Sequence, residues 1–213
     1  MSTGDQKKTT PRLGRPTDDA KRAAIVEAAA QMFFNLGFAA TAIEQVAAKA
    51  GVSKVTVYNH FGDKRGLFAA AVECECEKMR GHFSIDSSDT EDLHVLFRRI
   101  GEGMIAFLSR PEMIQFERRI AAETVHDPEL GIAFLDAGPR RMKRAFSALL
   151  DSLVAAGRLD IEDTMVAAEQ FASMAKGFGD LERRFGAAID GDLNRRRLES
   201  AVEVFLAAYR RSD

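Results

Sequence analysis

The side chains of this 213-residue chain that are best suited to bind another molecule lie between residues 54 and 64. They carry ammonium, hydroxyl, amide and imidazole groups, on Lys54, Thr56, Tyr58, Asn59, His60 and Lys64. Such groups donate hydrogen bonds to the phosphates and base edges of DNA. A solvated surface seldom places tyrosine beside valine and histidine on so short a segment, which makes it a candidate for nucleic-acid recognition.

The residues just before this segment have the spacing of a helix-turn-helix, in which two helices meet at a steep angle across a very short turn. Ala47 is small where the second helix crosses the first, and Gly51 adopts a left-handed turn without steric cost. Val52 and Val57 fill the wedge between the helices. Unrelated tight helical turns also contain such residues, so the turn indicates DNA binding only together with the donors that follow it.

Four predicted helices position these side chains. Gly37 ends the first, and the spacing Thr41-x-x-Glu44 is typical of a capping box at the start of the second. Ser53 and Asp63 then cap the third and the fourth. The four helices are predicted over residues 18–36, 42–50, 53–60 and 63–80.

The remainder of the chain also repeats apolar residues at helical spacing. Pro111 opens one helix, and Gly138 with Pro139 bends another. No segment shows sustained alternation of apolar and polar residues, so we expect an all-α fold with an N-terminal three-helix helix-turn-helix domain and a C-terminal helical bundle. The later helices are predicted over about 93–108, 111–127, 130–153, 161–181 and 192–210.

Charge divides the chain in a similar way. Residues 1–65 carry a net charge of +4 and residues 66–213 a net charge of −6. This asymmetry indicates a DNA-facing part on an acidic body, although charge alone does not distinguish it from chance. We divide the chain into a flexible basic arm (1–16), a helix-turn-helix DNA-binding domain with a connecting helix (17–80) and a C-terminal regulatory and dimerisation domain (81–213).

Composition excludes several classes of protein. No apolar run approaches the ~20 residues that span a bilayer, and no apolar signal core is present, so we expect a cytoplasmic protein without a membrane partner. Cys74 and Cys76 are too few and too close together for a disulfide framework. A thiol or metal sensor is an alternative reading of this pair, but at i and i+2 on a helix the two side chains point about 200° apart and do not share one ion.

A set of motifs runs in register from Gly14 to about Leu67: Gly14-Arg15-Pro16, Ile25-x-x-Ala28-Ala29, Leu36-Gly37-Phe38-x-x-Thr41, Ile43-x-x-Val46-Ala47-x-x-Ala50-Gly51-Val52-Ser53 and Thr56-Val57-Tyr58-x-His60-Phe61-x-Asp63-Lys64-x-x-Leu67. Together they resemble the tetracycline-repressor (TetR/AcrR) family of transcriptional regulators. Ala42 departs from the pattern, because members usually have Ser or Thr there. The second half is more loosely similar to one subclass of C-terminal domain in that family.

The resemblance implies roles for individual residues. Lys54 would donate to guanine and Val55 would pack on a thymine methyl group in the major groove, while other side chains contact phosphates and fix the register. The arm with Arg15 either reaches the DNA backbone and minor groove or is disordered. The predicted DNA-binding residues are Arg15, Thr41, Ser53, Lys54, Val55, Thr56, Tyr58, Asn59, His60 and Lys64.

The resemblance also implies a homodimer on an inverted-repeat operator in double-stranded DNA, because one recognition helix reads too few base pairs for a genome. The last two long helices, about 161–181 and 192–210, carry the expected contact, unless their alanine-rich faces close the core of one monomer instead. The predicted interface residues are Met165, Ala168, Ala172, Ala175, Ala201, Val202, Phe205 and Ala208.

Members of this family usually bind a small effector between the helices of the C-terminal domain. The phenylalanines and methionines there suit either an adaptable apolar pocket or a filled core. We therefore expect a repressor released by a small apolar effector through the helix at 63–80, with an effector-independent DNA-binding protein as the alternative. The predicted pocket residues are Phe97, Met104, Phe107, Met113, Phe116, Phe134, Phe146, Phe171, Met174 and Phe178.

An enzyme is the remaining alternative. Two Glu-x-x-His pairs, Glu91 with His94 and Glu123 with His126, have the spacing found in di-iron helix bundles. The first pair falls on the polar face of its predicted helix and the second at a helix end, so neither projects into a core. No phosphate-binding glycine loop or nucleophile motif is present. We expect no enzymatic activity, no metal and no cofactor.

Overall fold

The computed structural model of the chain describes residues 18–80, 92–188 and 190–211. Over these ranges it consists of ten α-helices and one isolated antiparallel bridge between Leu159 and Arg210. The predicted all-α fold, with an N-terminal helix-turn-helix domain and a C-terminal helical domain, is confirmed. The basic arm with Arg15, the polar segment 81–91 and Glu91 lie outside the described residues. Within them, no helix is long and apolar enough to cross a membrane.

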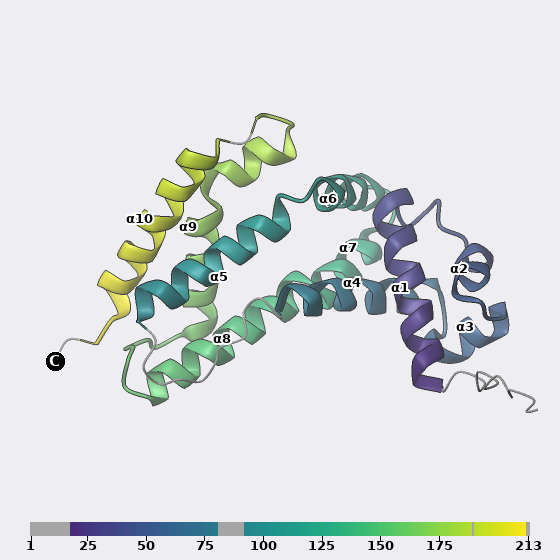
Figure 1. The fold of residues 1–213 in the computed structure, drawn as a ribbon, viewed down its shortest axis with the longest axis horizontal. Coiled ribbons are helices and arrows are strands. Elements are labelled where there is room, and N and C mark those ends of the chain that lie inside the picture. Colours follow the sequence, from purple (N-terminus) through teal and green to yellow (C-terminus); the bar gives the residue numbers. More distant parts are fainter. Residues whose placement is uncertain (1–17, 81–91, 189, 212–213) are drawn as a thin grey trace, which may run out of the picture.

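The helices form an elongated molecule, in which α1, α2 and α3 gather at one end and α9 and α10 at the other (Figure 1). The long helices α4 and α8 run between the two ends. The helices are α1 (Asp18–Leu36), α2 (Ile43–Ala50), α3 (Lys54–Phe61), α4 (Lys64–Arg80), α5 (Leu93–Leu108), α6 (Pro111–Glu123), α7 (Pro128–Ala137), α8 (Pro139–Ala155), α9 (Thr164–Arg184) and α10 (Gly191–Tyr209).

Side-chain caps begin α3 and α4 where the sequence predicts them. Ser53 Oγ accepts a hydrogen bond from Thr56 N at 3.1 Å, and Asp63 Oδ1 accepts one from Gly66 N at 2.7 Å. The predicted capping box at the start of α2 is wrong. Ala42 occupies the N-cap position, and no side chain caps this helix end. The Thr41 hydroxyl donates instead to the carbonyl oxygen of Gly37, at 2.7 Å.

Two apolar cores hold the helices together. The first core joins α1, α2, α3 and α4 with α6 and α7. Phe116 of α6 stacks on Phe34 of α1 with ring centroids 4.0 Å apart, and it meets Phe134 of α7 edge-on. The second core joins α5, α8, α9 and α10 around Phe97, Phe171 and Phe205. Helices α1 to α4 therefore share a core with α6 and α7, which lie far from them in sequence.

Helix α9 is interrupted near its C-terminal end. Gly177 has φ 51° and ψ −157°, which breaks the helical hydrogen-bond ladder. Beyond this kink the Arg183 side chain is almost fully buried, lies 3.4 Å from a carboxylate oxygen of Glu117 in α6, and donates to Asp180 and to the Leu108 carbonyl. A buried guanidinium requires such partners, and they anchor the last turns of α9 against α5 and α6.

Candidate nucleic-acid interface

The turn between α2 and α3 has the conformation that the sequence predicts. Gly51 lies in the left-handed region, with φ 68° and ψ 31°, and its N–H bonds back to the last turn of α2. A side chain here would strain the backbone. Ala47 and Val57 are buried where α2 meets α3, and Val52 is partly buried beside them. α3 therefore packs against α2 through the side that carries Val57.

The opposite side of α3 faces solvent. Val55 is 66% exposed and Tyr58 is 40% exposed, and Lys54 and Asn59 are also exposed. These residues form two adjacent i, i+4 rows, Lys54 with Tyr58 and Val55 with Asn59, because such residues stack on a helix surface. Four of the predicted DNA-binding side chains therefore share one accessible face.

The other predicted DNA-binding residues lie around this face. The Ser53 and Thr56 hydroxyls are 2.8 Å apart at the helix start. His60 Nε2 lies 3.4 Å from an Asp18 carboxylate oxygen, with 14% of the histidine side chain exposed. Lys64 Nζ donates to the Ala39 carbonyl oxygen at 3.2 Å, and burial lowers its pKa. DNA contacts by these four residues stay predictions.

The prediction that Thr41 contacts DNA is wrong. Only 1% of this residue is exposed, and its hydroxyl is taken up by the Gly37 carbonyl. A phosphate contact requires an accessible hydroxyl. Thr41 instead ties the end of α1 to the loop that leads into α2.

The partner of Lys54 was not predicted from the sequence. Glu44, in the first turn of α2, accepts a hydrogen bond from Lys54 Nζ, and the same ammonium lies 5.6 Å from the centroid of the Tyr58 ring. The ion pair lowers the pKa of Glu44 and raises that of Lys54. The spacing Thr41-x-x-Glu44 predicted a capping role for Glu44. No sequence pattern around Glu44 indicates an ion pair with a residue ten positions later.

A second missed contact connects α6 to the helix-turn-helix. The Glu123 carboxylate accepts hydrogen bonds from Phe38 N at 3.1 Å and from Ala39 N at 2.9 Å, and Arg119 donates to the Phe34 carbonyl at 3.0 Å. Gly37 has φ 92°, and a Cβ there would lie 2.7 Å from a Glu123 oxygen. We call these contacts of Glu123 and Arg119 the α6 clamp. Arg119 and Glu123 thus hold the end of α1, so α4, the helix through which effector release is expected, is not the single link between the helix-turn-helix and the C-terminal helices.

Helix α4 makes its own link to α7. Arg65 Nη2 lies 3.0 and 2.9 Å from the two carboxylate oxygens of Asp127, which also caps α7 through Leu130 N. The start of α4 is therefore tied to the start of α7. Together with the α6 clamp, this pair ties α6 and α7 to α1 and α4, and Arg141 of α8 adds ion pairs to Glu73 and Glu77 of α4.

The residues of the predicted effector pocket do not line one common cavity. Phe107, Met113, Phe116 and Phe134 pack in or against the first core, whereas Phe97, Met104, Phe146, Phe171 and Met174 pack in or against the second. Phe178 belongs to neither and is 64% exposed. The prediction that all ten residues line a common pocket is wrong, because their helical stripes face different neighbours.

Most of the predicted dimer interface is buried within the monomer. Ala168, Ala175, Ala201, Val202 and Phe205 are at most 4% exposed in the second core, so their assignment to a dimer interface is wrong. From the predicted set, Met165 and Ala208 are exposed and Ala172 is partly exposed. The alternative, in which the alanine-rich faces close the monomer core, applies to the five buried residues.

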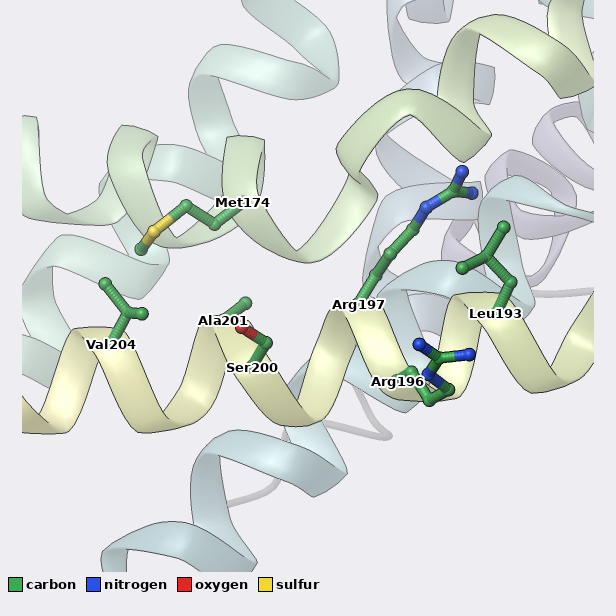
Figure 2. A pocket seen from close by; sticks show the side chains of 7 residues that line it. All are labelled: Met174, Leu193, Arg196, Arg197, Ser200, Ala201 and Val204. Atoms are coloured by element: carbon green, nitrogen blue, oxygen red, sulfur yellow. The ribbon is translucent and has the colours of Figure 1, made fainter.

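A shallow hollow lies on the outer side of α9 and α10, where Met174 faces Val204, Ala201 and Ser200 across the groove (Figure 2). Leu193, Arg196 and Arg197 continue its lining toward the start of α10. Val204 is 54% exposed. This surface combines small and apolar side chains with an exposed arginine, Arg196.

The two thiols on α4 differ in accessibility. Cys74 is partly buried and Cys76 is buried. Burial raises the pKa of Cys74, and it raises the pKa of Cys76 to about 12. A thiol sensor requires a thiolate near neutral pH, which a raised pKa disfavours.

We predict that iodoacetamide at pH 8 leaves Cys76 unmodified in the native protein and modifies Cys74 slowly. A pKa near 12 leaves almost no thiolate on Cys76 at this pH, and thiolate is the reacting species. Mass spectrometry of the alkylated peptides measures both rates, and the protein unfolded in urea serves as the control in which both cysteines react. Rapid modification of native Cys76 would show that the thiol is activated and would support a redox role.

Two family models match separate parts of the chain, and solved structures match most of its length. Residues 25–71 match the family model of bacterial regulatory proteins of the tetR family, and residues 96–211 match that of the C-terminal domain of AefR-like transcriptional repressors. The structure is similar to that of a TetR-family regulator from Mesorhizobium loti, with 26% identity, 92% of this chain and 100% of that chain covered, and a TM-score of 0.74. The flavonoid-responsive regulator FrrA is 28% identical, with the same coverage and a TM-score of 0.72. A TetR-family regulator from Pseudomonas syringae is 29% identical over 91% of this chain and 99% of its own, with a TM-score of 0.63.

Proposed function

The chain belongs to the TetR family of DNA-binding transcriptional regulators, and on this premise we propose that it is a repressor that binds an inverted-repeat operator as a homodimer. The observation that carries the proposal is the exposed face of α3, with Lys54, Val55, Tyr58 and Asn59 side by side. Lysine and valine distinguish base edges, and tyrosine and asparagine donate to the backbone or to bases. We therefore infer that α3 is the recognition helix and that this face enters the major groove.

The outer side of α9 and α10 is the proposed dimer interface. Val166 and Val204 are 46% and 54% exposed there, and Ser200 and Ala208 are small enough for a second pair of helices to approach closely. This surface lies at the opposite end of the molecule from α3 (Figure 1). A dimer formed there holds two recognition helices apart, as two half-sites in successive grooves require.

We propose that an effector binds between the two cores. Phe107 of α5 and Met142 of α8 are partly buried against the first core, whereas Met104 and Phe146 of the same helices are partly buried against the second. Methionine side chains adapt readily to a bound apolar molecule. A ligand that separates α5 from α8 would shift α6, and the α6 clamp would pass that shift to the end of α1.

FrrA responds to flavonoids, so flavonoids are the first probes for the effector. We expect a binding flavonoid to lower DNA affinity about 5- to 150-fold, the range of common allosteric couplings. Fluorescence anisotropy of a labelled operator measures the change, and calorimetry without DNA measures flavonoid binding itself. A flavonoid that binds without changing DNA affinity would contradict coupling through this site.

The DNA-binding proposal is tested by selecting sites from a randomised duplex library and by substituting Lys54. We predict that Lys54→Ala lowers the ratio of affinities for selected and random DNA about 5- to 150-fold, since one good base contact contributes about 1–3 kcal/mol of discrimination. Lys78→Ala is the control, because its side chain has the same 48% exposure as that of Lys54 and is also ion-paired, but lies on α4. Equal losses on both DNAs for Lys54→Ala would contradict the base-reading role.

A further inference from the structure

The exposed face of α3 contains one lysine and no arginine, so a single fixed positive charge is available there to read bases. That charge is not free in the structure. Lys54 Nζ donates to the Glu44 carboxylate and also lies against the Tyr58 ring. Both members of the ion pair are accessible, with 48% of the Lys54 side chain and 62% of the Glu44 side chain exposed.

We propose that Glu44 is a specificity-determining residue, which holds the Lys54 ammonium on the base-reading face of α3 and keeps it from phosphates. This inference rests on the proposed function of α3 as the recognition helix. Glu44 acts here as a positioning residue, since it sets the place of the Lys54 ammonium.

The chemistry of the two side chains explains why a partner is needed. A lysine ammonium is a mobile point charge on a four-carbon stem, so an unrestrained Lys54 would reach phosphates of any sequence. Glu44 occupies one of its three donors and leaves two for guanine O6 and N7. The ring of Tyr58 restrains the same ammonium from α3 itself.

The negative charge of Glu44 also acts apart from this positioning. A carboxylate next to the recognition helix repels the phosphates of every duplex, whatever its sequence. Because this repulsion lowers the affinity for selected and random DNA alike, it leaves their ratio unchanged. The ratio depends on the base contact of the positioned Lys54 ammonium.

The isosteric substitution Glu44→Gln tests the proposal. Exposed ion pairs contribute little to stability, so the variant should fold, which thermal unfolding checks. We expect affinity for random duplex to rise and the ratio of selected to random affinity to fall about tenfold, within the range of one lost base contact. The freed lysine should also steepen the dependence of log K on log salt by about one unit for each subunit.

Two further variants make the test specific. Glu27→Gln makes the same change at a 51% exposed carboxylate that pairs with Lys78 on α4, and it should leave the affinity ratio unchanged. In a Lys54→Ala background, Glu44→Gln should no longer change the ratio, because the positioned ammonium is absent. If Glu44→Gln alters binding equally with and without Lys54, the carboxylate acts only by repulsion and positioning is refuted.

The result for the wild-type protein separates this inference from the proposed function. A site enriched from the library and a lower ratio for Lys54→Ala support α3 as the reading helix, whatever Glu44 does. With those results, an unchanged ratio and salt slope for Glu44→Gln overturn the role of Glu44 alone. A wild-type protein that enriches no site overturns the function of α3 and this inference together.

Discussion

Substituting Val204 by glutamate is expected to convert the protein from a dimer into a monomer and to lower its affinity for a two-half-site operator by about 10²- to 10⁴-fold. The magnitude is the avidity gained when two binding modules are linked. Val204 is 54% exposed on α10 and lines the hollow opposite Met174. A carboxylate buried there between two subunits would lose its hydration. The arginines of the hollow, Arg196 and Arg197, lie eight and seven residues earlier on α10, about two helical turns away.

Sedimentation velocity measures the oligomeric state of the Val204→Glu variant, and fluorescence anisotropy measures its operator affinity. Val125→Glu is the matched control, because Val125 is 74% exposed and lies between α6 and α7, two helices of the first core, whereas α10 belongs to the second core. The control should remain dimeric and bind the operator normally. A Val204→Glu variant that remains dimeric with unchanged operator affinity would place the interface on another surface.

Replacing Phe116 by alanine is expected to lower the free energy of unfolding by about 3–5 kcal/mol and to loosen the DNA-binding helices. The cost is that of a large cavity in a well-packed core. Phe116 is fully buried, and its ring contacts Phe34 of α1, Phe68 of α4 and Phe134 of α7. Its removal therefore weakens the joint between α6 and the helix-turn-helix as well as the core.

Phe97→Ala is the control for this experiment, since Phe97 is equally buried but lies in the second core. Chemical denaturation should show a comparable loss of stability for both variants. Hydrogen exchange of α1 and α4 amides should accelerate more in Phe116→Ala than in Phe97→Ala, because local opening depends on local packing. Equal acceleration in the two variants would mean that the two cores unfold as one unit.

The helices and the recognition turn were predictable from the sequence, because they depend on residues close together in the chain. The first predicted helix, 18–36, coincides with α1, and Ser53 and Asp63 begin α3 and α4 as their side chains predict. The left-handed turn at Gly51 follows from the absence of a Cβ. The exposed donors of α3 were predictable for the same reason, since Val57 marks the buried side of a single short helix.

The partners of charged side chains were not predicted where these partners are distant in sequence. Glu44 has the spacing of a capping box and Glu123 that of a metal-binding pair, yet they bind Lys54 and the amides of Phe38 and Ala39. The separation between Glu123 and these amides is 84 and 85 residues. A carboxylate accepts from any donor that folding brings within about 3 Å, so local spacing does not identify the donor.

The sequence does not show which helix each apolar stripe packs against; this is seen only once the helices are placed in space. Val202 is 1% exposed and Val204 is 54% exposed, although both belong to apolar positions of α10. Helical periodicity indicates that a face is buried, but burial against a helix of the same chain and burial against a second copy remove similar apolar area from water. The outcome depends on the angles at which helices far apart in sequence meet, which the periodicity of a single helix does not contain.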